Sequence, residues 1–148
     1  MKNQVNEKYS ELTYYTLGLQ DKCFIHQYVV DAFTVQTANN ETKDISLTFV
    51  LVGLYLYLEE NYTGKEVQEF HTLMSNKKLK WPCFILPTKC GEVNIDNVLE
   101  ANLGEERNKM IKTWCNSVWN TFSENHLEVR KIADYYLNIK KETTNRKH

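Results

Sequence analysis

Residues 24–38, FIHQYVVDAFTVQTA, set three polar side chains, those of His26, Asp31 and Gln36, among apolar residues at helical spacing. Buried polar groups in proteins nearly always have hydrogen-bond partners. The segment predicts a helix over residues 22–38 with Asp21 as its N-cap. It also indicates either a functional site or a polar core in which every group is satisfied.

The rest of the chain also predicts helices. Both prolines, Pro82 and Pro87, lie in one short segment, so the strongest helix breaker is missing elsewhere. The order of apolar and polar residues predicts helices over residues 7–19, 45–61, 64–79, 95–101, 105–125 and 127–141. Residues 81–93, which hold both prolines and Gly91, are expected to be extended or to form a short hairpin.

The helix expected over residues 45–61 is apolar around most of its circumference. Such a helix is typically wrapped by others, so we expect it at the centre of the molecule. Ser46, Gly53 and Glu60 recur every seven residues along one side of it. This narrow stripe marks a line along which a neighbouring helix can approach closely.

Thr63 and Glu66 have the spacing of a capping box, and Asn94 can cap the helix expected over residues 95–101, so helix starts are predicted at both points. With the other patterns, this predicts an all-α fold, a compact bundle of six or seven helices with one Pro-containing extended segment. The length fits a single domain, residues 1–148. Residues 1–6 and 142–148 are expected to be frayed tails.

The charge balance excludes some partners. Among 148 residues, 18 are Lys or Arg and 19 are Asp or Glu, so the net charge is close to zero. The long-range field that draws proteins to nucleic acid or to anionic lipid is therefore missing. We expect no nucleic-acid partner, and a chain that folds alone or as a homodimer.

The sequence also predicts the cellular compartment of the protein. The amino terminus has no apolar stretch of the kind an export signal needs. The longest apolar run, residues 45–58, is shorter than the roughly 18–20 residues of a membrane span. The four cysteines form no C-x-x-C pair. We expect a cytoplasmic protein with reduced thiols and no membrane contact.

Three histidines, His26, His71 and His126, fall on the apolar sides of three different helices. Helical bundles build metal sites from side chains on facing helices, and neutral imidazoles bind divalent transition metals. The three imidazoles are therefore one candidate metal site. No two of them are spaced i, i+3 or i, i+4, so no pair is preorganised on one helix.

The alternative is that these polar groups are satisfied within the fold. Each imidazole then bonds a backbone carbonyl or a Tyr side chain. Asp31 points about 140° away from His26 on a straight helix, beside Gln27, and is expected to pair with it at the surface or between helices. Gln36 is expected to tie a loop or a neighbouring helix to its own helix.

A series of short motifs runs through the chain in order: FIHQYVVDAF at 24–33 with Gln36, FVLVGLYL at 49–56, TGKEVQ at 63–68, His71, Trp81-Pro82, and WCNSVW at 114–119. The series resembles a family of small bacterial proteins catalogued as a domain of unknown function, over most of residues 9–126. In the family pattern His follows the Gln that matches Gln36, whereas this chain has Thr37. The resemblance implies no activity, cofactor or substrate, but it singles out His26, Asp31, Gln36, His71 and Trp81 as candidate ligand-binding residues.

Two functions remain open from the sequence. The first is a non-catalytic module that binds a small ligand or another protein, with a pocket at His26 and His71. The second is a metal-dependent enzyme, a hydrolase, whose divalent transition metal would be held by His26, His71 and His126. The two differ in whether the three imidazoles meet in the folded chain.

Overall fold

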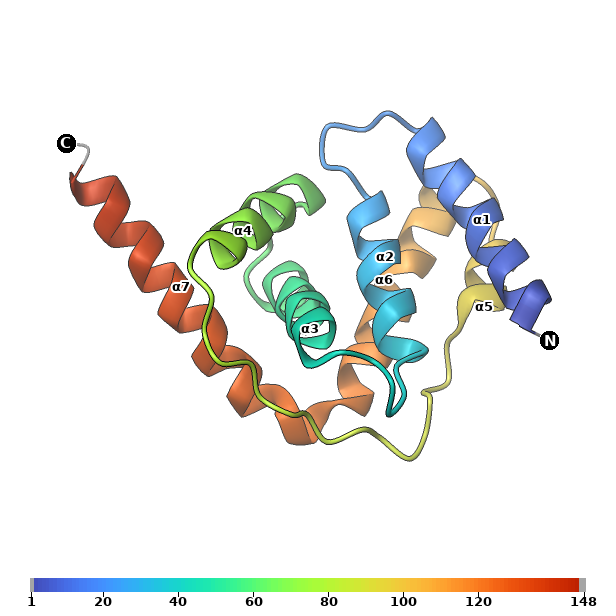
Figure 1. The fold of residues 1–148 in the computed structure, drawn as a ribbon. Helices are drawn as coiled ribbons and strands as arrows, with labels where there is room; N and C mark the ends of the chain where they lie inside the picture. Colours follow the sequence, from blue (N-terminus) through green and yellow to red (C-terminus); the bar gives the residue numbers. More distant parts are fainter. Residues whose placement is uncertain (1, 147–148) are drawn as a thin grey trace.

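The computed structural model describes residues 2–146, with side chains described for residues 4–143. This part of the chain contains helices and no strand, which confirms the all-α fold. The seven α-helices are α1 (Lys2–Gly18), α2 (His26–Gln36), α3 (Asp44–Glu59), α4 (Gly64–Asn76), α5 (Ile95–Glu100), α6 (Glu105–Thr121) and α7 (His126–Arg146), with a 3₁₀ turn at Ser123–Asn125 (Figure 1).

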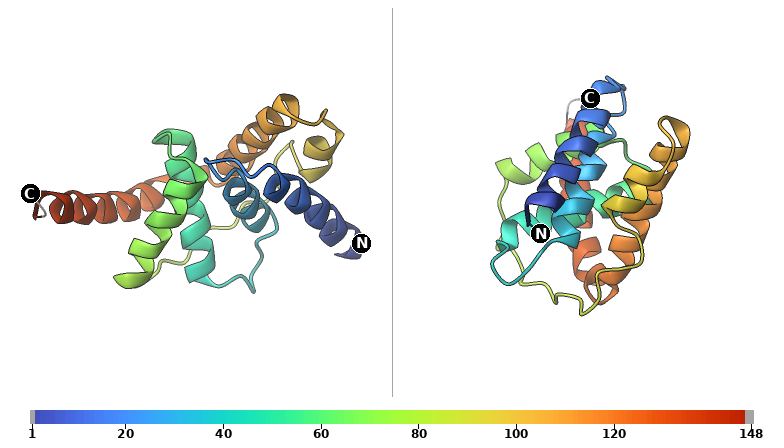
Figure 2. Two further views of the ribbon diagram at one scale, coloured as in Figure 1. Left: turned by 90° about the horizontal axis from the view of Figure 1, so that it is seen from above. Right: turned by 90° about the vertical axis from the view of Figure 1, so that its right-hand side faces the viewer.

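The helix α3 lies at the centre, as its sequence predicts. It packs against α2, α4, α6 and α7, because its apolar residues face every neighbour. The helix α2 packs against α3, α6, α1 and α4, and α5 lies against α1 and α6. Figures 1 and 2 show the two termini at opposite ends, with the last part of α7 extending away from the other helices.

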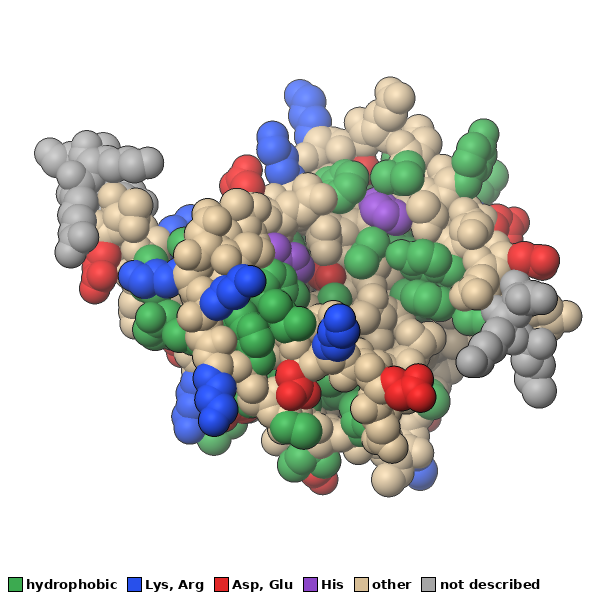
Figure 3. All heavy atoms as spheres, in the orientation of Figure 1, with side chains coloured by type: hydrophobic (Ala, Val, Ile, Leu, Met, Phe, Trp, Pro, Cys, Tyr) green, Lys and Arg blue, Asp and Glu red, His purple; other side chains and the backbone are tan. Residues whose placement is uncertain are grey.

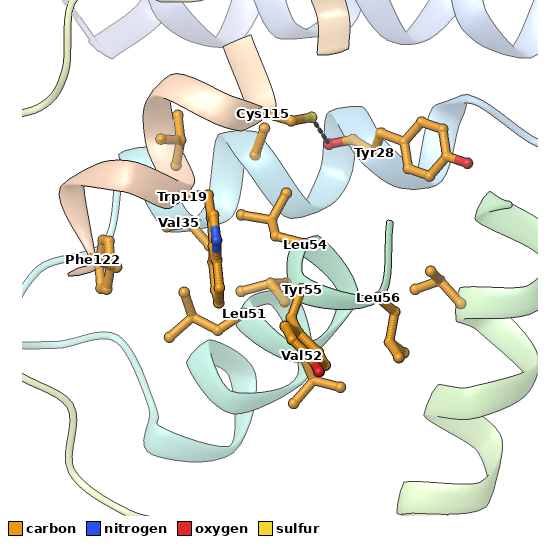
Figure 4. Packing of buried hydrophobic residues seen from close by; sticks show 14 of the residues in the cluster. Tyr28, Val35, Leu51, Val52, Leu54, Tyr55, Leu56, Cys115, Trp119 and Phe122 are labelled. Carbon is orange, nitrogen blue, oxygen red and sulfur yellow. Dashed lines mark hydrogen bonds between the residues drawn. The ribbon is translucent and has the colours of Figure 1, made fainter. Parts of the chain in front are cut away.

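The core consists mainly of side chains that α2, α3, α4, α6 and α7 turn toward one another, and Leu12 of α1, Val98 of α5 and Phe84 of the extended segment complete it. Figure 4 shows Val35 of α2, Leu51 of α3 and Trp119 of α6 in this packing. The buried Cys115 thiol donates to the Tyr28 carbonyl oxygen at 3.7 Å, which adds a polar link between α6 and α2 (Figure 4). Among the described residues, no helix combines the length and the apolar character that crossing a membrane requires.

Local signals predicted several helix ends correctly. The α4 N-terminus has the capping box: Thr63 Oγ1 accepts from the Glu66 amide and Glu66 Oε1 accepts from the Thr63 amide. Asn94 caps α5 by accepting from the Asp96 and Asn97 amides. Residues 81–93 are neither helix nor strand, so they are extended and do not form a hairpin.

The start of α2 differs from the prediction. Residues 22–25 form turns, and the helix begins at His26 because Phe24 has a φ of +56°, in the left-handed region. This turn touches α4, where the Lys65 amide donates to the Cys23 carbonyl at 3.1 Å. A Cβ on Gly64 would overlap the Phe24 carbonyl oxygen, so the close approach requires glycine there. Asp21 caps the turn, accepting from the Ile25 amide at 3.0 Å.

The expected tails are helical where they are described. The helix α1 begins at Lys2 and α7 continues to Arg146, so residues 2–6 and 142–146 belong to helices. Neither segment contains Gly or Pro, and nothing in the sequence stops helix propagation there. Met1, Lys147 and His148 lie outside the described residues.

Candidate functional site

An open hollow of about 650 Å³ lies where α2, α3 and α4 meet. Its polar lining residues come from all three helices and the segment after α4: Gln27, Asp31, Thr34, Ser46, His71, Ser75 and Lys78. Its apolar wall is formed by Val30, Ile45, Phe49 and Val50. Figure 3 shows a His side chain next to a recessed carboxylate, bordered by hydrophobic side chains, between α4 and α2.

Asp31 is the most unusual group of this hollow. Its side chain is only 1% exposed. Oδ1 accepts from Gln27 Nε2 at 3.0 Å, whereas Oδ2 is buried and has no hydrogen-bond partner. Burial raises the pKa of this carboxyl well above its usual value, because the charged form loses its hydration. The carboxyl is therefore held in its neutral form over a wide pH range.

The expected pairing of Asp31 with Gln27 is confirmed, but a surface position for the pair is wrong. The reason lies on α3, where Gly53 faces Asp31. A Cβ at Gly53 would overlap Asp31 Oδ2, so only glycine leaves room for the carboxyl between the two helices. Gly53 belongs to the stripe that the sequence marked for close helix approach.

His71 is the second titratable group in the hollow. Its Nε2 lies 2.7 Å from the Phe49 carbonyl oxygen. A carbonyl oxygen only accepts, so Nε2 carries the proton and the neutral ring keeps Nδ1 as an acceptor. Burial lowers the pKa of His71, and the bond to Phe49 opposes this only in part. His71 is thus a neutral imidazole with one acceptor nitrogen.

Trp81 packs against Phe49, one of the residues that form the apolar wall of the hollow. Its ring meets the Phe49 ring edge-on, with centroids 5.5 Å apart, and Phe49 in turn lies 5.3 Å from the His71 ring. Trp81 does not itself line the hollow. Of the candidate ligand-binding residues, Asp31 and His71 both line the hollow. Trp81, at the start of the extended segment, packs on the Phe49 ring.

The hollow contains Ser, His and Asp side chains, but they do not form a hydrolytic triad. In a triad the carboxylate bonds one imidazole nitrogen and the hydroxyl bonds the other. Here Asp31 Oδ2 bonds nothing, and His71 Nε2 is occupied by the Phe49 carbonyl. The arrangement offers hydrogen-bonding groups to a ligand, and no activated nucleophile is assembled in it.

His26 lies elsewhere, at the contact between α2 and α1. Its Nδ1 is 2.9 Å from Thr16 Oγ1, and its ring meets Phe24 edge-on at 5.7 Å. Burial lowers the pKa of His26 as well. His26 is therefore not a lining residue of the hollow, contrary to the pocket expected from the sequence.

His126 is the first residue of α7. Its ring stacks on Trp119 at 3.8 Å, and Nε2 donates to the Trp119 carbonyl at 2.8 Å. The candidate metal site of His26, His71 and His126 is not assembled. Each imidazole is hydrogen-bonded in a different part of the fold, to Thr16, Phe49 and Trp119 respectively. Over residues 2–146, no group of three or more His, Cys, Asp or Glu residues is arranged to hold a metal ion.

Gln36 ties α2 to its neighbours, as one reading of the sequence predicts. Its Nε2 donates to the Cys90 and Val93 carbonyls at 2.9 and 2.8 Å, and its Oε1 accepts from Trp114 Nε1 at 2.8 Å. Asn125, which the sequence did not single out, acts alike: it accepts from the Ile85 amide and donates to the Ile85 carbonyl. Neither amide group is left for a ligand, so Gln36 braces the extended segment and is not positioned as a ligand contact.

The hollow contains residues that sequence reasoning missed. Thr34, Ser46 and Lys78 line it, and Gly53 makes room for its carboxyl. Only the stripe containing Ser46 and Gly53 carried a signal in the sequence. Thr34 and Lys78 look like ordinary surface residues until α2 and α4 are placed side by side.

A family model matches residues 6–123, and its description is "Family of unknown function (DUF5946)". The match covers every helix that lines the hollow. Neither the curated proteins nor the solved structures compared with the chain yield a match.

Proposed function

Because the chain belongs to DUF5946, a family of unknown function, we propose its function from geometry: it binds a small ligand in the hollow between α2, α3 and α4. The observation that carries the proposal is the Asp31 carboxyl, which is buried at the wall of this hollow with one oxygen lacking a partner. Oδ1 accepts from Gln27, so the proton of the neutral carboxyl lies on Oδ2, and a bound ligand supplies the acceptor that this O–H lacks once the carboxyl turns from Gly53 toward the hollow.

The energetics favour a role in binding. A buried polar group without a partner costs roughly 1–3 kcal/mol of stability. The protein recovers this cost only when a ligand in the hollow bonds the unpartnered oxygen. Gly53 preserves the arrangement, because any side chain there would displace the carboxyl.

The size and lining of the hollow also suit a small molecule. Its volume of about 650 Å³ falls within the range of roughly 300–1,000 Å³ that is typical of ligand pockets. Such pockets are mainly apolar with a few polar groups that orient the ligand. Val30, Ile45, Phe49 and Val50 form the apolar part here, and Asp31 and His71 form the polar part.

A fragment screen followed by amide chemical-shift mapping tests the proposal. We expect bound fragments to shift the amide signals of residues 27–34, 45–50 and 71–78. Asp31→Ala is expected to weaken these shifts, whereas Asp134→Ala, a truncation at an exposed site on α7, leaves them unchanged. A screen in which no fragment shifts these amides overturns the proposal, and this outcome needs only the wild-type protein.

A further inference from the structure

Three hydroxyl groups that line the hollow make no hydrogen bond within the described part of the chain. They belong to Thr34 of α2, Ser46 of α3 and Ser75 of α4. By contrast, the hydroxyls of Thr48 on α3 and Thr72 on α4 donate to backbone carbonyls one turn back, at 2.7 and 3.2 Å. The hollow therefore holds hydroxyl donors that the protein itself does not use.

Ser46 and Ser75 lie at the same end of the hollow. The helices α3 and α4 pack on each other and run in opposite directions, so the start of α3 lies beside the end of α4 (Figure 2, left). The bond between His71 Nε2 and the Phe49 carbonyl, at 2.7 Å, joins the two helices. Ser46 precedes Phe49 and Ser75 follows His71 by about one helical turn each, so both hydroxyls stand on the same side of this bond.

Lys78 gives this end of the hollow a positive charge. It follows the end of α4 closely, is exposed, and forms no ion pair with any described residue. The other titratable lining groups are neutral at neutral pH, because burial raises the pKa of Asp31 well above its usual value and lowers the pKa of His71. Asp44, the acidic residue at the start of α3, lines a different hollow beside the extended segment. Lys78 is therefore the only charged group among the described lining residues.

The rest of the wall suits a carbon skeleton. Phe49, with Val30, Ile45 and Val50, forms its apolar part, and burial of apolar surface favours binding. His71 Nδ1 is an acceptor, since Nε2 carries the proton, so a carboxylate is disfavoured beside this ring. The hollow thus separates an apolar stretch from an end that has hydroxyl donors and a positive charge.

We infer that the ligand is a carboxylic acid with an apolar body, bound as its carboxylate at the end of the hollow formed by Ser46, Ser75 and Lys78. A carboxylate only accepts hydrogen bonds, and its two oxygens have room for both hydroxyls and the ammonium group. The apolar body lies along Phe49. This inference rests on the proposed function and names its ligand class, and it does not depend on which acceptor of the ligand reaches Asp31.

Three probes with the same aromatic body separate the ligand classes: phenylacetate, phenethyl alcohol and phenethylamine. We expect phenylacetate to shift the amides of residues 27–34, 45–50 and 71–78 with an affinity at least about fivefold above that of the alcohol, because a charge-assisted hydrogen bond is roughly twice as strong as a neutral one. The amine should bind most weakly, since its charge repels Lys78.

The outcomes for the inference and for the proposed function can be told apart. Equal or tighter binding of the alcohol or the amine in this hollow overturns the inference and leaves the proposed function standing. Failure of all three probes also overturns the inference, and the wider fragment screen then decides the proposed function separately.

A substitution at Lys78 locates the charge that the acid recognises. Lys78→Gln keeps an exposed polar side chain, so it should fold and should lower the affinity for phenylacetate to about that for phenethyl alcohol. Lys77→Gln removes the same charge from the neighbouring residue, which is exposed and does not line the hollow, and should keep the preference for the acid. A preference that survives Lys78→Gln overturns the pairing of the carboxylate with Lys78.

The hydroxyl contacts have their own test. Ser75→Ala should weaken phenylacetate binding more than phenethyl alcohol binding, because the carboxylate makes the stronger bond to a hydroxyl donor. Ser10→Ala, at an exposed site on α1, should change neither affinity. Equal weakening of both probes by Ser75→Ala contradicts a bond from this hydroxyl to the carboxylate.

Salt gives a readout that needs only the wild-type protein. Raising the ionic strength from about 0.01 M to about 1 M shortens the Debye length from about 30 Å to about 3 Å, which screens the exposed Lys78 charge. The advantage of phenylacetate over phenethyl alcohol should therefore shrink with salt, measured by the same amide shifts. An advantage that stays constant over this range contradicts recognition of the acid by Lys78.

Discussion

The C-terminal end and the middle of α2 hold polar groups in opposite circumstances. Toward its C-terminal end, Gln36 uses both its amide nitrogen and its amide oxygen to bind Cys90, Val93 and Trp114. In its middle, Asp31 leaves one carboxyl oxygen without a partner at the wall of a hollow. Both residues stand among the same kind of apolar neighbours in the sequence.

This difference separates the structural role of Gln36 from the binding role proposed for Asp31. Gln36 and Asn125 form what we call the brace, the side-chain contacts that hold the extended segment 81–93 against α2, α6 and the turn before α7. Every polar group of the brace is satisfied by the protein itself. At the wall of the hollow Asp31 Oδ2 has no partner within the described part of the chain, and in the proposed function a ligand supplies one.

The largest expected effect is at Asp31, where replacing the buried carboxyl should raise the stability of the folded protein at neutral pH. Its folded-state pKa is raised, so the folded protein keeps a proton that the unfolded chain loses above about pH 3.9. Stability therefore falls as the pH rises from that value to the folded-state pKa, by about 1.4 kcal/mol per pH unit. Asp31→Asn should remove this loss and be more stable than the wild type at pH 7.

Urea unfolding of both proteins between pH 4 and pH 8 measures this effect. The stability difference between Asp31→Asn and the wild type should widen as the pH rises. Asp134→Asn makes the same substitution at an exposed site and should follow the wild-type curve. Parallel curves for Asp31→Asn and the wild type would show that the carboxyl carries no such cost.

Substitutions in the brace should lower the stability of the folded protein, whereas Asp31→Asn should raise it. Gln36→Ala removes three hydrogen bonds and leaves the indole N–H of the fully buried Trp114 without a partner. We expect a loss of about 3 kcal/mol, since an unpaired buried donor adds its desolvation cost to the lost bonds. Chemical denaturation measures it, and Gln68→Ala, at an exposed site on α4, is the control. A loss no greater than that of the control would show that Gln36 does not brace the fold.

A somewhat smaller loss is expected at the other end of the brace. Asn125→Ala removes the two bonds to the Ile85 backbone, at 2.8 and 2.7 Å. We expect about 2 kcal/mol of destabilisation and faster amide hydrogen exchange at Ile85. Asn120→Ala, on the exposed face of α6, should change neither quantity. Unchanged exchange at Ile85 in Asn125→Ala would contradict the assigned contact.

The smallest effect belongs to His71. Burial lowers its folded-state pKa, so below the unfolded value of about 6.5 the unfolded chain takes up a proton that the folded protein refuses. Acidification from pH 7 to pH 5 thus costs the wild type stability at this residue, by an amount we expect to stay below about 1 kcal/mol. His71→Gln should show a smaller loss over the same range, measured by thermal unfolding. An equal loss in both proteins would show that His71 titrates as it does in the unfolded chain.

Local chemistry made part of this structure predictable. The Thr63–Glu66 capping box and the Asn94 cap depend on residues a few positions apart, and both occur as expected. The central place of α3 follows from apolar residues on all its sides. The pairing of Asp31 with Gln27 is likewise a contact within one helix turn. The late start of α2, at His26 and not at residue 22, was not predictable, because the turn before it depends on contact with Gly64.

The candidate site was predictable only in pieces. His71 and Asp31 stood out as polar residues in apolar surroundings, but the sequence grouped His71 with His26 and His126 instead. Helical periodicity gives the direction of a side chain relative to its own helix and says nothing about which other helix it faces. The separate hydrogen bonds of the three imidazoles show how far that grouping was from the folded arrangement.

The sequence by itself determined the all-α class, the central helix and the caps, because these follow from periodicity and from contacts between residues close in the chain. Only the tertiary structure decided that Asp31 is buried with a free oxygen, that His71 shares its hollow, and that Gln36 is fully bonded. The physical reason is that hydration and hydrogen bonding of these groups depend on helices distant in sequence. Gly53 on α3 and His71 on α4 set the surroundings of a carboxyl that belongs to α2.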